Sequence, residues 1–221
     1  MIHAGYDARE AIGFHVFNQS VIETSPGVGV LPLVNPASQH DGSNAFTYSR
    51  FPIPELQHYQ GPALFVDGSD MLLRADVAEL LERYDPRYAV QVVKHKYKTK
   101  HPRKYVGTSL ECDNRDYPCK NWSSAMLINP RHPGNLQGRA MIAEAMSLGD
   151  GAFLHRFGWL CADEIGELPI EWNWLADEYG ENPEEKLLHW TAGIPGFSHY
   201  AGAPHAKEWH ETAERMMGGA K

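Results

Sequence analysis

Two aspartates, Asp67 and Asp70, directly follow a short apolar run in the sequence ALFVDGSD, which spans residues 63–70. The run is long enough for one buried strand, and the carboxyl ends of such strands are where open α/β sheets bind their ligands. Carboxylate oxygens suit a divalent cation that also contacts diphosphate oxygens. Because Asp, Gly and Ser are also frequent in turns, these residues alone fit a plain turn as well as a metal site.

His189 follows a second short apolar run, residues 187–188, and precedes a segment that contains Gly193 and Pro195. These residues predict a tight turn that presents His189 at a strand end, as Asp67 is presented. A single histidine after a strand is more often structural than a metal ligand, so this segment alone does not decide its role.

Arg50 stands in the aromatic segment TYSRF, shortly before the aspartates. Its guanidinium fits either stacking on a neighbouring ring or a contact to a nucleotide phosphate. A strongly basic run, residues 94–104, follows the aspartates in the chain. This run fits a solvated loop, a lid over phosphates or a track for an anionic acceptor.

Ser123 and Ser124 lead into the apolar run 125–128. Small polar residues at a strand start either cap a turn or line a sugar pocket. Asp163 lies in an aromatic-rich segment, residues 157–175, where it could face a polar pocket. We expect the tryptophans of that segment to pack in the core.

The apolar periodicity predicts alternating strands and helices, which is the pattern of an α/β domain. The predicted strand at 28–34 contains Pro32, which cannot donate to a sheet and therefore favours an edge position. Strands are expected at residues 2–4, 28–34, 63–66, 88–93, 125–128 and 187–188, and helices at 8–21, 76–81, 136–148 and 203–217; residues 71–73 form a further short apolar run.

The composition is that of a globular protein of 221 residues, with 43% hydrophobic residues and a net charge of -8. The acidic balance argues against general nucleic-acid binding, although it leaves room for a local basic groove. Three cysteines without a CxxC motif argue against a disulfide framework and favour a reducing cytoplasm. No run approaches the roughly 20 apolar residues of a membrane span, so we expect a soluble, cytoplasmic protein.

Taken in order, these segments resemble retaining glycosyltransferases of the GT-A type, in particular the family 8 group that includes glycogenin and the bacterial galactosyltransferases. ALFVDGSDMLL resembles the strand and DxD motif of that family, and HWTAGIPGF resembles its late histidine motif. The other matching segments are IHAGYDARE, TYSRF, NWSSAMLIN and LCADEIGELPIEWNWL. The order of the matches carries more weight than any one motif.

The resemblance implies one GT-A domain over residues 1–221, with a Rossmann-like mixed sheet flanked by helices. Its nucleotide-binding half would span about residues 1–95 and its acceptor-side half about 105–221. It implies Mn²⁺ or Mg²⁺ held by Asp67, Asp70 and His189, and a UDP-sugar donor from which the sugar is transferred with retention. The acceptor hydroxyl would belong to a glycan, a lipid-linked sugar or a modified nucleic acid, and a homodimer is an open option.

The resemblance also implies which residues contact the donor. The residues implied to act beside the transferred sugar are Asp163, Ser123 and Ser124. The residues implied to hold the nucleotide and its phosphates are Tyr6, Asp7, Arg9, Arg50, Asp67, Gly68, Ser69, Lys94 and Gly193.

This sequence departs from the family pattern at three places. Its carboxylates form DxxD rather than DxD, which leaves open whether Asp67, Ser69 or Asp70 contacts the metal. The late motif has Pro195 and Gly196 where the family has a lysine, and the basic run is the alternative source of that phosphate contact. The strand after Ser123 lacks the family's asparagine and glycine, which leaves the donor sugar open.

Three rival functions use the same residues. The aspartates also suit a metal-dependent nucleotidyltransferase or phosphohydrolase. The basic run, residues 94–104, suits a polyanion-binding protein or a glycosyltransferase that acts on modified DNA bases.

Overall fold

The computed structural model describes residues 1–34 and 44–218. Its centre is a mixed six-stranded sheet with the order β2-β1-β3-β8-β5-β9. Strand β8 runs antiparallel to its neighbours β3 and β5, whereas the other pairings in this sheet are parallel. The strands are Ile2–Gly5 (β1), Val30–Leu33 (β2), Ala63–Val66 (β3), Ala125–Ile128 (β8), Val90–Val92 (β5) and Ile165–Glu167 (β9). This mixed α/β sheet in a single domain confirms the predicted fold class, and β2 lies at the edge, as Pro32 indicated.

Both faces of the central sheet are covered, which explains why β3 is apolar at every position. Leu64 and Val66 point into one core cluster, where Phe14 and Phe17 of helix α1 (Ala11–Thr24) also lie. Phe65 lies in the cluster on the opposite face. A strand that is buried on both faces must be apolar throughout rather than alternating.

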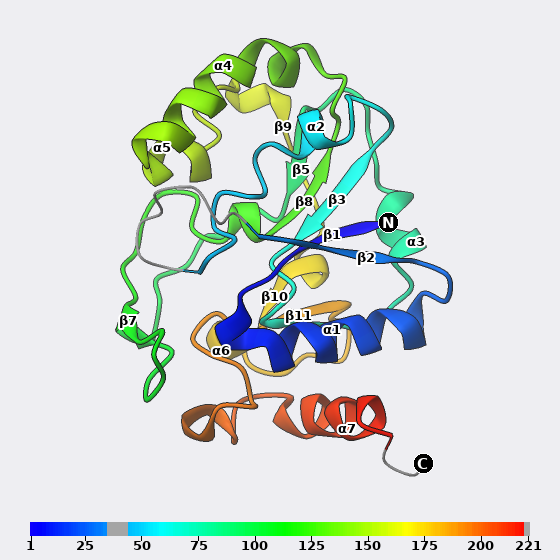
Figure 1. Ribbon diagram of the computed structural model, residues 1–221, viewed down its shortest axis with the longest axis vertical. Helices are drawn as coiled ribbons and strands as arrows, with labels where there is room; N and C mark the ends of the chain where they lie inside the picture. Colours follow the sequence, from blue (N-terminus) through cyan, green and yellow to red (C-terminus); the bar gives the residue numbers. More distant parts are fainter. Residues whose placement is uncertain (35–43, 219–221) are drawn as a thin grey trace.

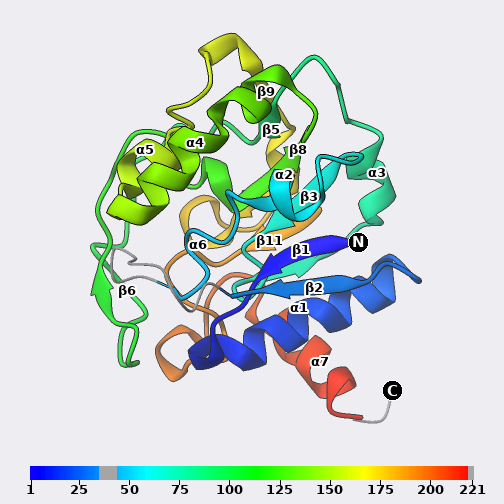
Figure 2. The same ribbon diagram turned by 45° about the horizontal axis from the view of Figure 1, so that its top comes forward.

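The helices form layers on the two sides of the sheet (Figures 1 and 2). Helix α1 packs between strand β4 (Met71–Leu73) and the C-terminal helix α7, whereas α4 and α5 lie on the opposite side of the sheet. The helices other than α1 are Ile53–Leu56 (α2), Val77–Leu81 (α3), Pro133–Leu148 (α4), Gly151–His155 (α5), Ala176–Tyr179 (α6) and Ala206–Met216 (α7). Among the described residues, none of the helices combines the length and the apolar character that a bilayer crossing requires.

A second sheet has the order β10-β11-β4 and lies beside the carboxyl end of β3. It consists of Trp174–Leu175 (β10), Leu187–His189 (β11) and Met71–Leu73 (β4). Strands β6 (Arg103–Lys104) and β7 (Cys112–Asp113) form a separate two-stranded ribbon. The three cysteines are free thiols, as their number and spacing predicted.

The predicted elements are present, with shifted ends. The first helix starts as a 3₁₀ turn over Ala8–Glu10, because Asp7 accepts a hydrogen bond from the Arg9 amide, and becomes α-helical from Ala11. Asp76 caps α3 by accepting from the Ala78 amide at 2.9 Å. The predicted strand 88–93 shortens to β5, because it pairs with β8 and β9 over those three residues.

Candidate metal and donor site

The turn after β3 places both aspartates on one side of the chain. Gly68 adopts a φ of +75°, and the amide of Ser69 donates to the carbonyl of Asp67 at 2.8 Å. The Ser69 hydroxyl points away from the carboxylates and donates to the Gly5 carbonyl at 3.2 Å. This bond and its complete burial exclude Ser69 as a metal ligand in this conformation, which leaves Asp67 and Asp70.

Helix α1 supports the same turn from below. A Cβ atom on Gly13 would lie 1.9 Å from the Ser69 carbonyl oxygen. Only a glycine therefore allows the helix to pack this closely against the turn. The close packing fixes the backbone between the two carboxylates.

His189 reaches the aspartates because β11 pairs antiparallel with β4, the strand that begins at Met71. In this register His189 lies opposite Met71, one residue after Asp70, and the Trp190 amide donates to the Asp70 carbonyl at 2.9 Å. The short apolar runs 71–73 and 187–189 thus form the pair of strands that assembles the site.

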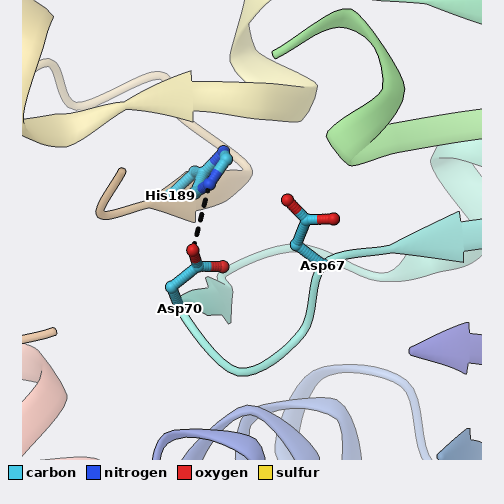
Figure 3. A group of neighbouring side chains, drawn as sticks. All are labelled: Asp67, Asp70 and His189. Atoms are coloured by element: carbon cyan, nitrogen blue, oxygen red, sulfur yellow. Dashed lines mark ion pairs between the residues drawn. The ribbon is translucent and has the colours of Figure 1, made fainter. Parts of the chain in front are cut away.

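Figure 3 shows Asp67, Asp70 and His189 facing one another. One ligand atom from each lies within 4.8 Å of the others, and Nε2 of His189 is 3.4 Å from Oδ2 of Asp70. Oδ1 of Asp70 is buried and accepts no hydrogen bond from any described residue. Two carboxylates and an imidazole with an unpaired buried oxygen form a donor set that fits a divalent cation.

Arg50 balances the charge of this cluster. Its Nη1 lies 2.6 Å from Oδ1 of Asp67. Burial raises the pKa of Asp67 to about 6, and Arg50 opposes that rise. Burial lowers and the Asp70 carboxylate raises the pKa of His189, with a net upward shift. The metal-free cluster therefore retains protons more readily than exposed groups of the same types.

The cluster opens into a cavity of about 690 Å³. Six of the residues predicted for the site line it: Arg50, Asp67, Asp70, Ser123, Ser124 and His189. The amide of Asp67 donates to the Ser124 carbonyl at 2.8 Å, so the start of β8 lies beside the metal ligands. The predicted combination of a carboxylate site and a small polar wall is thus present in one cavity.

Asp163 does not reach this cavity. It is exposed in a 3₁₀ turn just before β9, and β9 runs parallel to β5 and antiparallel in direction to β8. Asp163 therefore lies at the edge of the sheet opposite to Ser124 and Asp67, where it cannot touch a substrate that is bound at the cluster.

Lys94 is also directed elsewhere. Its ammonium group donates to the Ile165 carbonyl at 2.7 Å, and it lies 5.8 Å from the centroid of the Trp122 ring. Gly193 lies outside the cavity lining and provides space for the ring of Tyr200, which a Cβ atom would approach to 2.4 Å.

The predicted nucleotide residues near the N-terminus are not among the described residues that line the cavity. The ring of Tyr6 packs on Phe14, with centroids 5.2 Å apart. Asp7 is buried and binds both the Arg9 guanidinium and the Ala45 amide, the latter at 2.8 Å. In this conformation Asp7 and Arg9 support the segment that enters the cavity at Asn44 rather than line the cavity themselves.

Three further residues belong to the site. Oδ1 of Asn173 accepts a hydrogen bond from Nδ1 of His189 over 2.9 Å, Lys104 lines the cavity, and the Ser123 hydroxyl lies 2.7 Å from Nδ1 of His155. Lys104 ends the basic run, and Asn173 belongs to the Trp-Asn pair, so the sequence carried a signal for both. His155 lies at the end of a short helix and carried none.

No family model matches this chain. It is 35% identical over 229 residues to protein CDI of Arabidopsis thaliana, an alignment that covers 96% of this chain and 85% of the plant protein. The chain belongs to the protein CDI family.

Solved structures resemble the fold over almost the whole chain. The bifunctional glycosyltransferase WbbM has a TM-score of 0.65 at 15% identity, and the galactosyltransferase LgtC, in complex with donor and acceptor sugar analogues, has 0.63 at 14%. These alignments cover 96% and 97% of this chain, and 49% and 95% of the respective proteins. The chain thus spans about half the length of WbbM. GlyE of Streptococcus pneumoniae has a TM-score of 0.65 at 13% identity and is covered over 59% of its length by 96% of this chain. The fold is that of the GT-A glycosyltransferases.

Proposed function

We propose that this protein is a metal-dependent glycosyltransferase of the family 8 type, which transfers a sugar from a UDP-sugar to a hydroxyl acceptor with retention of configuration. The observation that carries the proposal is the cluster of Asp67, Asp70 and His189 at the wall of a 690 Å³ cavity in a GT-A fold. A cavity of this size suits a nucleotide-sugar.

In this proposal Asp67, Asp70 and His189 hold Mn²⁺ or Mg²⁺ beside the diphosphate of the donor. The cation would stabilise the negative charge that develops on the departing nucleoside diphosphate. Arg50 keeps Asp67 in place, and Lys104 extends a second positive charge into the cavity. Lys104 takes the role that the missing lysine of the late motif would have had.

Ser123 would accept a hydrogen bond from a hydroxyl of the donor sugar. The hydroxyl of Ser123 contacts Nδ1 of His155, and its carbonyl accepts a hydrogen bond from the Arg50 guanidinium at 2.8 Å. Ser123 is thus held on both its backbone and its side chain. In this proposal the half of the chain up to about residue 95 binds the donor nucleotide, and about residues 105–221 bind the acceptor. The metal ligands come from both halves.

The experiment is a panel of UDP- and GDP-sugars with Mn²⁺, in which release of the nucleoside diphosphate and transfer to added glycans are measured. We expect release with at least one UDP-sugar, and a loss of at least about 100-fold in Asp70→Asn. Asp163→Asn is the matched control, because it removes a carboxylate at the opposite sheet edge, and it should retain full activity. Release of pyrophosphate or phosphate instead would favour the nucleotidyltransferase or phosphohydrolase.

A further inference from the structure

Asn173 lies between the predicted metal ligand His189 and the start of β8, and its side chain is completely buried. Its Nδ2 donates to the Asn121 carbonyl at 3.0 Å and to the Ser124 hydroxyl oxygen at 2.9 Å. Its Oδ1 is 2.9 Å from Nδ1 of His189. The three contacts engage both ends of the amide group, so the position of each partner restricts the orientation of the amide toward the other two.

The orientation of the Asn173 amide follows from the chemistry of its partners. The Asn121 carbonyl can only accept hydrogen bonds, so the end of the amide that faces it must be the NH₂ group. The Ser124 hydroxyl donates its own hydrogen to the same carbonyl at 2.7 Å, so its oxygen presents a lone pair to Asn173. A flipped amide would place Oδ1 against two oxygens, which is unfavourable in a buried site.

This orientation determines the proton position on His189. Because Oδ1 of Asn173 is an acceptor, Nδ1 of His189 must carry a hydrogen, and an unprotonated Nδ1 would leave two lone pairs facing each other at 2.9 Å. In the neutral ring, Nε2 then has the free lone pair, and Nε2 is the atom that lies 3.4 Å from Asp70. A metal ligand needs this tautomer.

We propose that Asn173 is a positioning residue that holds His189 in its metal-binding tautomer and couples it to Ser124 at the donor-sugar wall. The inference rests on the proposed metal-dependent function. Without Asn173, the better acceptor for the ring hydrogen is the Asp70 carboxylate, so the hydrogen moves to Nε2 and occupies the position that a cation requires.

The test compares wild type, Asn173→Leu and Asn135→Leu. Asn135 is a matched control, because it is also buried and uses its whole amide, donating to the Ala89 and Asn129 carbonyls and accepting from Trp159, but it lies outside the cavity. Mn²⁺ affinity is measured by electron paramagnetic resonance. We expect the dissociation constant to rise about 10- to 100-fold in Asn173→Leu and to stay unchanged in Asn135→Leu.

A second measurement needs no metal. Long-range ¹H–¹⁵N NMR distinguishes the doubly protonated imidazole from its two neutral tautomers, and spectra recorded from about pH 9 upward report the tautomer of the neutral His189 ring. The His189→Gln spectrum assigns the signal. We expect the Nδ1–H form in wild type and the Nε2–H form in Asn173→Leu. An Nε2–H form in wild type, or wild-type Mn²⁺ affinity in Asn173→Leu, would overturn the inference.

Failure of the proposed metal-dependent function can be distinguished from failure of the inference about Asn173. If wild type binds no Mn²⁺, the metal-dependent function fails, and the tautomer still decides the role of Asn173. If Asn173→Leu does not fold, Asn173→Ala replaces it, because it also removes the acceptor at Nδ1 of His189. That variant should show the same rise of about 10- to 100-fold in the dissociation constant for Mn²⁺, and wild-type affinity would overturn the inference.

Discussion

Nη1 of Arg50 lies 2.6 Å from Oδ1 of Asp67, and the two side chains are 5% and 13% exposed. The guanidinium is held independently of this contact, because it also donates to the carbonyls of Thr47 and Ser123 and lies 4.8 Å from the centroid of the Phe65 ring. Arg50 is therefore a fixed positive charge beside the proposed metal site. Its contact with the Phe65 ring is one of the two roles that its aromatic sequence setting suggested, and the contact to a nucleotide phosphate stays a prediction.

Removing this charge should destabilise the protein. Arg50→Met leaves the Asp67 carboxylate buried without its partner, and we expect a loss of about 3 kcal/mol in the free energy of unfolding, measured by urea denaturation. Arg87→Met is the control, because it breaks an exposed pair with Asp85 and should have no measurable effect. Equal effects of the two substitutions would show that the buried pair contributes no more to the free energy of unfolding than the exposed pair.

Mn²⁺ should stabilise the protein more at pH 7.5 than at pH 5. Burial raises the pKa of Asp67 to about 6, so a proton competes with the cation below that pH. A carboxyl whose pKa is raised on folding contributes stability below its unfolded value, and that contribution is lost as the pH rises through about 6. His189, whose pKa is also raised, contributes with the same sign. The metal-free protein thus loses stability over the range in which metal binding strengthens.

The measurement is the shift in melting temperature caused by a fixed Mn²⁺ concentration between about pH 5 and 7.5. We expect the shift to grow with pH in wild type and to be absent at every pH in Asp67→Asn. A shift that does not depend on pH would mean that neither group is protonated before the cation binds.

Lys104 and Lys94 provide a matched pair of lysines from the same basic run. Lys104 lines the cavity, and none of the described carboxylates forms an ion pair with it, whereas Lys94 is bound to the Ile165 carbonyl outside the cavity. Lys104→Ala should raise the KM for the UDP-sugar about tenfold, the loss of one phosphate contact worth about 1.4 kcal/mol. Lys94→Ala should leave that KM unchanged. A larger effect of Lys94→Ala than of Lys104→Ala would show that Lys94, as the sequence resemblance implied, contacts the phosphates.

The sequence predicted the elements whose signal is local. The apolar run 63–66, the edge strand around Pro32 and the helix opened by Asp76 all appear where their residue types place them. The meeting of Asp67, Asp70 and His189 was also predictable, because strand ends gather at one edge of an α/β sheet and the motifs occur in the order of a known family.

The remaining parts depend on tertiary geometry. Asp163 lies in a turn beside a strand, as Asp67 and Asp70 do, but the direction of β9 places it at the other sheet edge, and strand direction is not a local property. Nothing near His155 distinguishes it from any other helix-terminal histidine until α5 packs beside Ser123. The choice between Lys94 and Lys104 likewise depends on how the basic run crosses α6, where Glu178 holds Thr99 and Lys100.

The pairing of β4 with β11 also sets the order in which the site can form during synthesis. Asp67 and Asp70 leave the ribosome early, but the strand that ends in His189 emerges much later. The third ligand must then close a long loop before it reaches the first two, a step with a high entropic cost and a high contact order. On the proposed function, Mn²⁺ binding would therefore mark a chain that has completed folding, and partially synthesised or misfolded chains should not bind it.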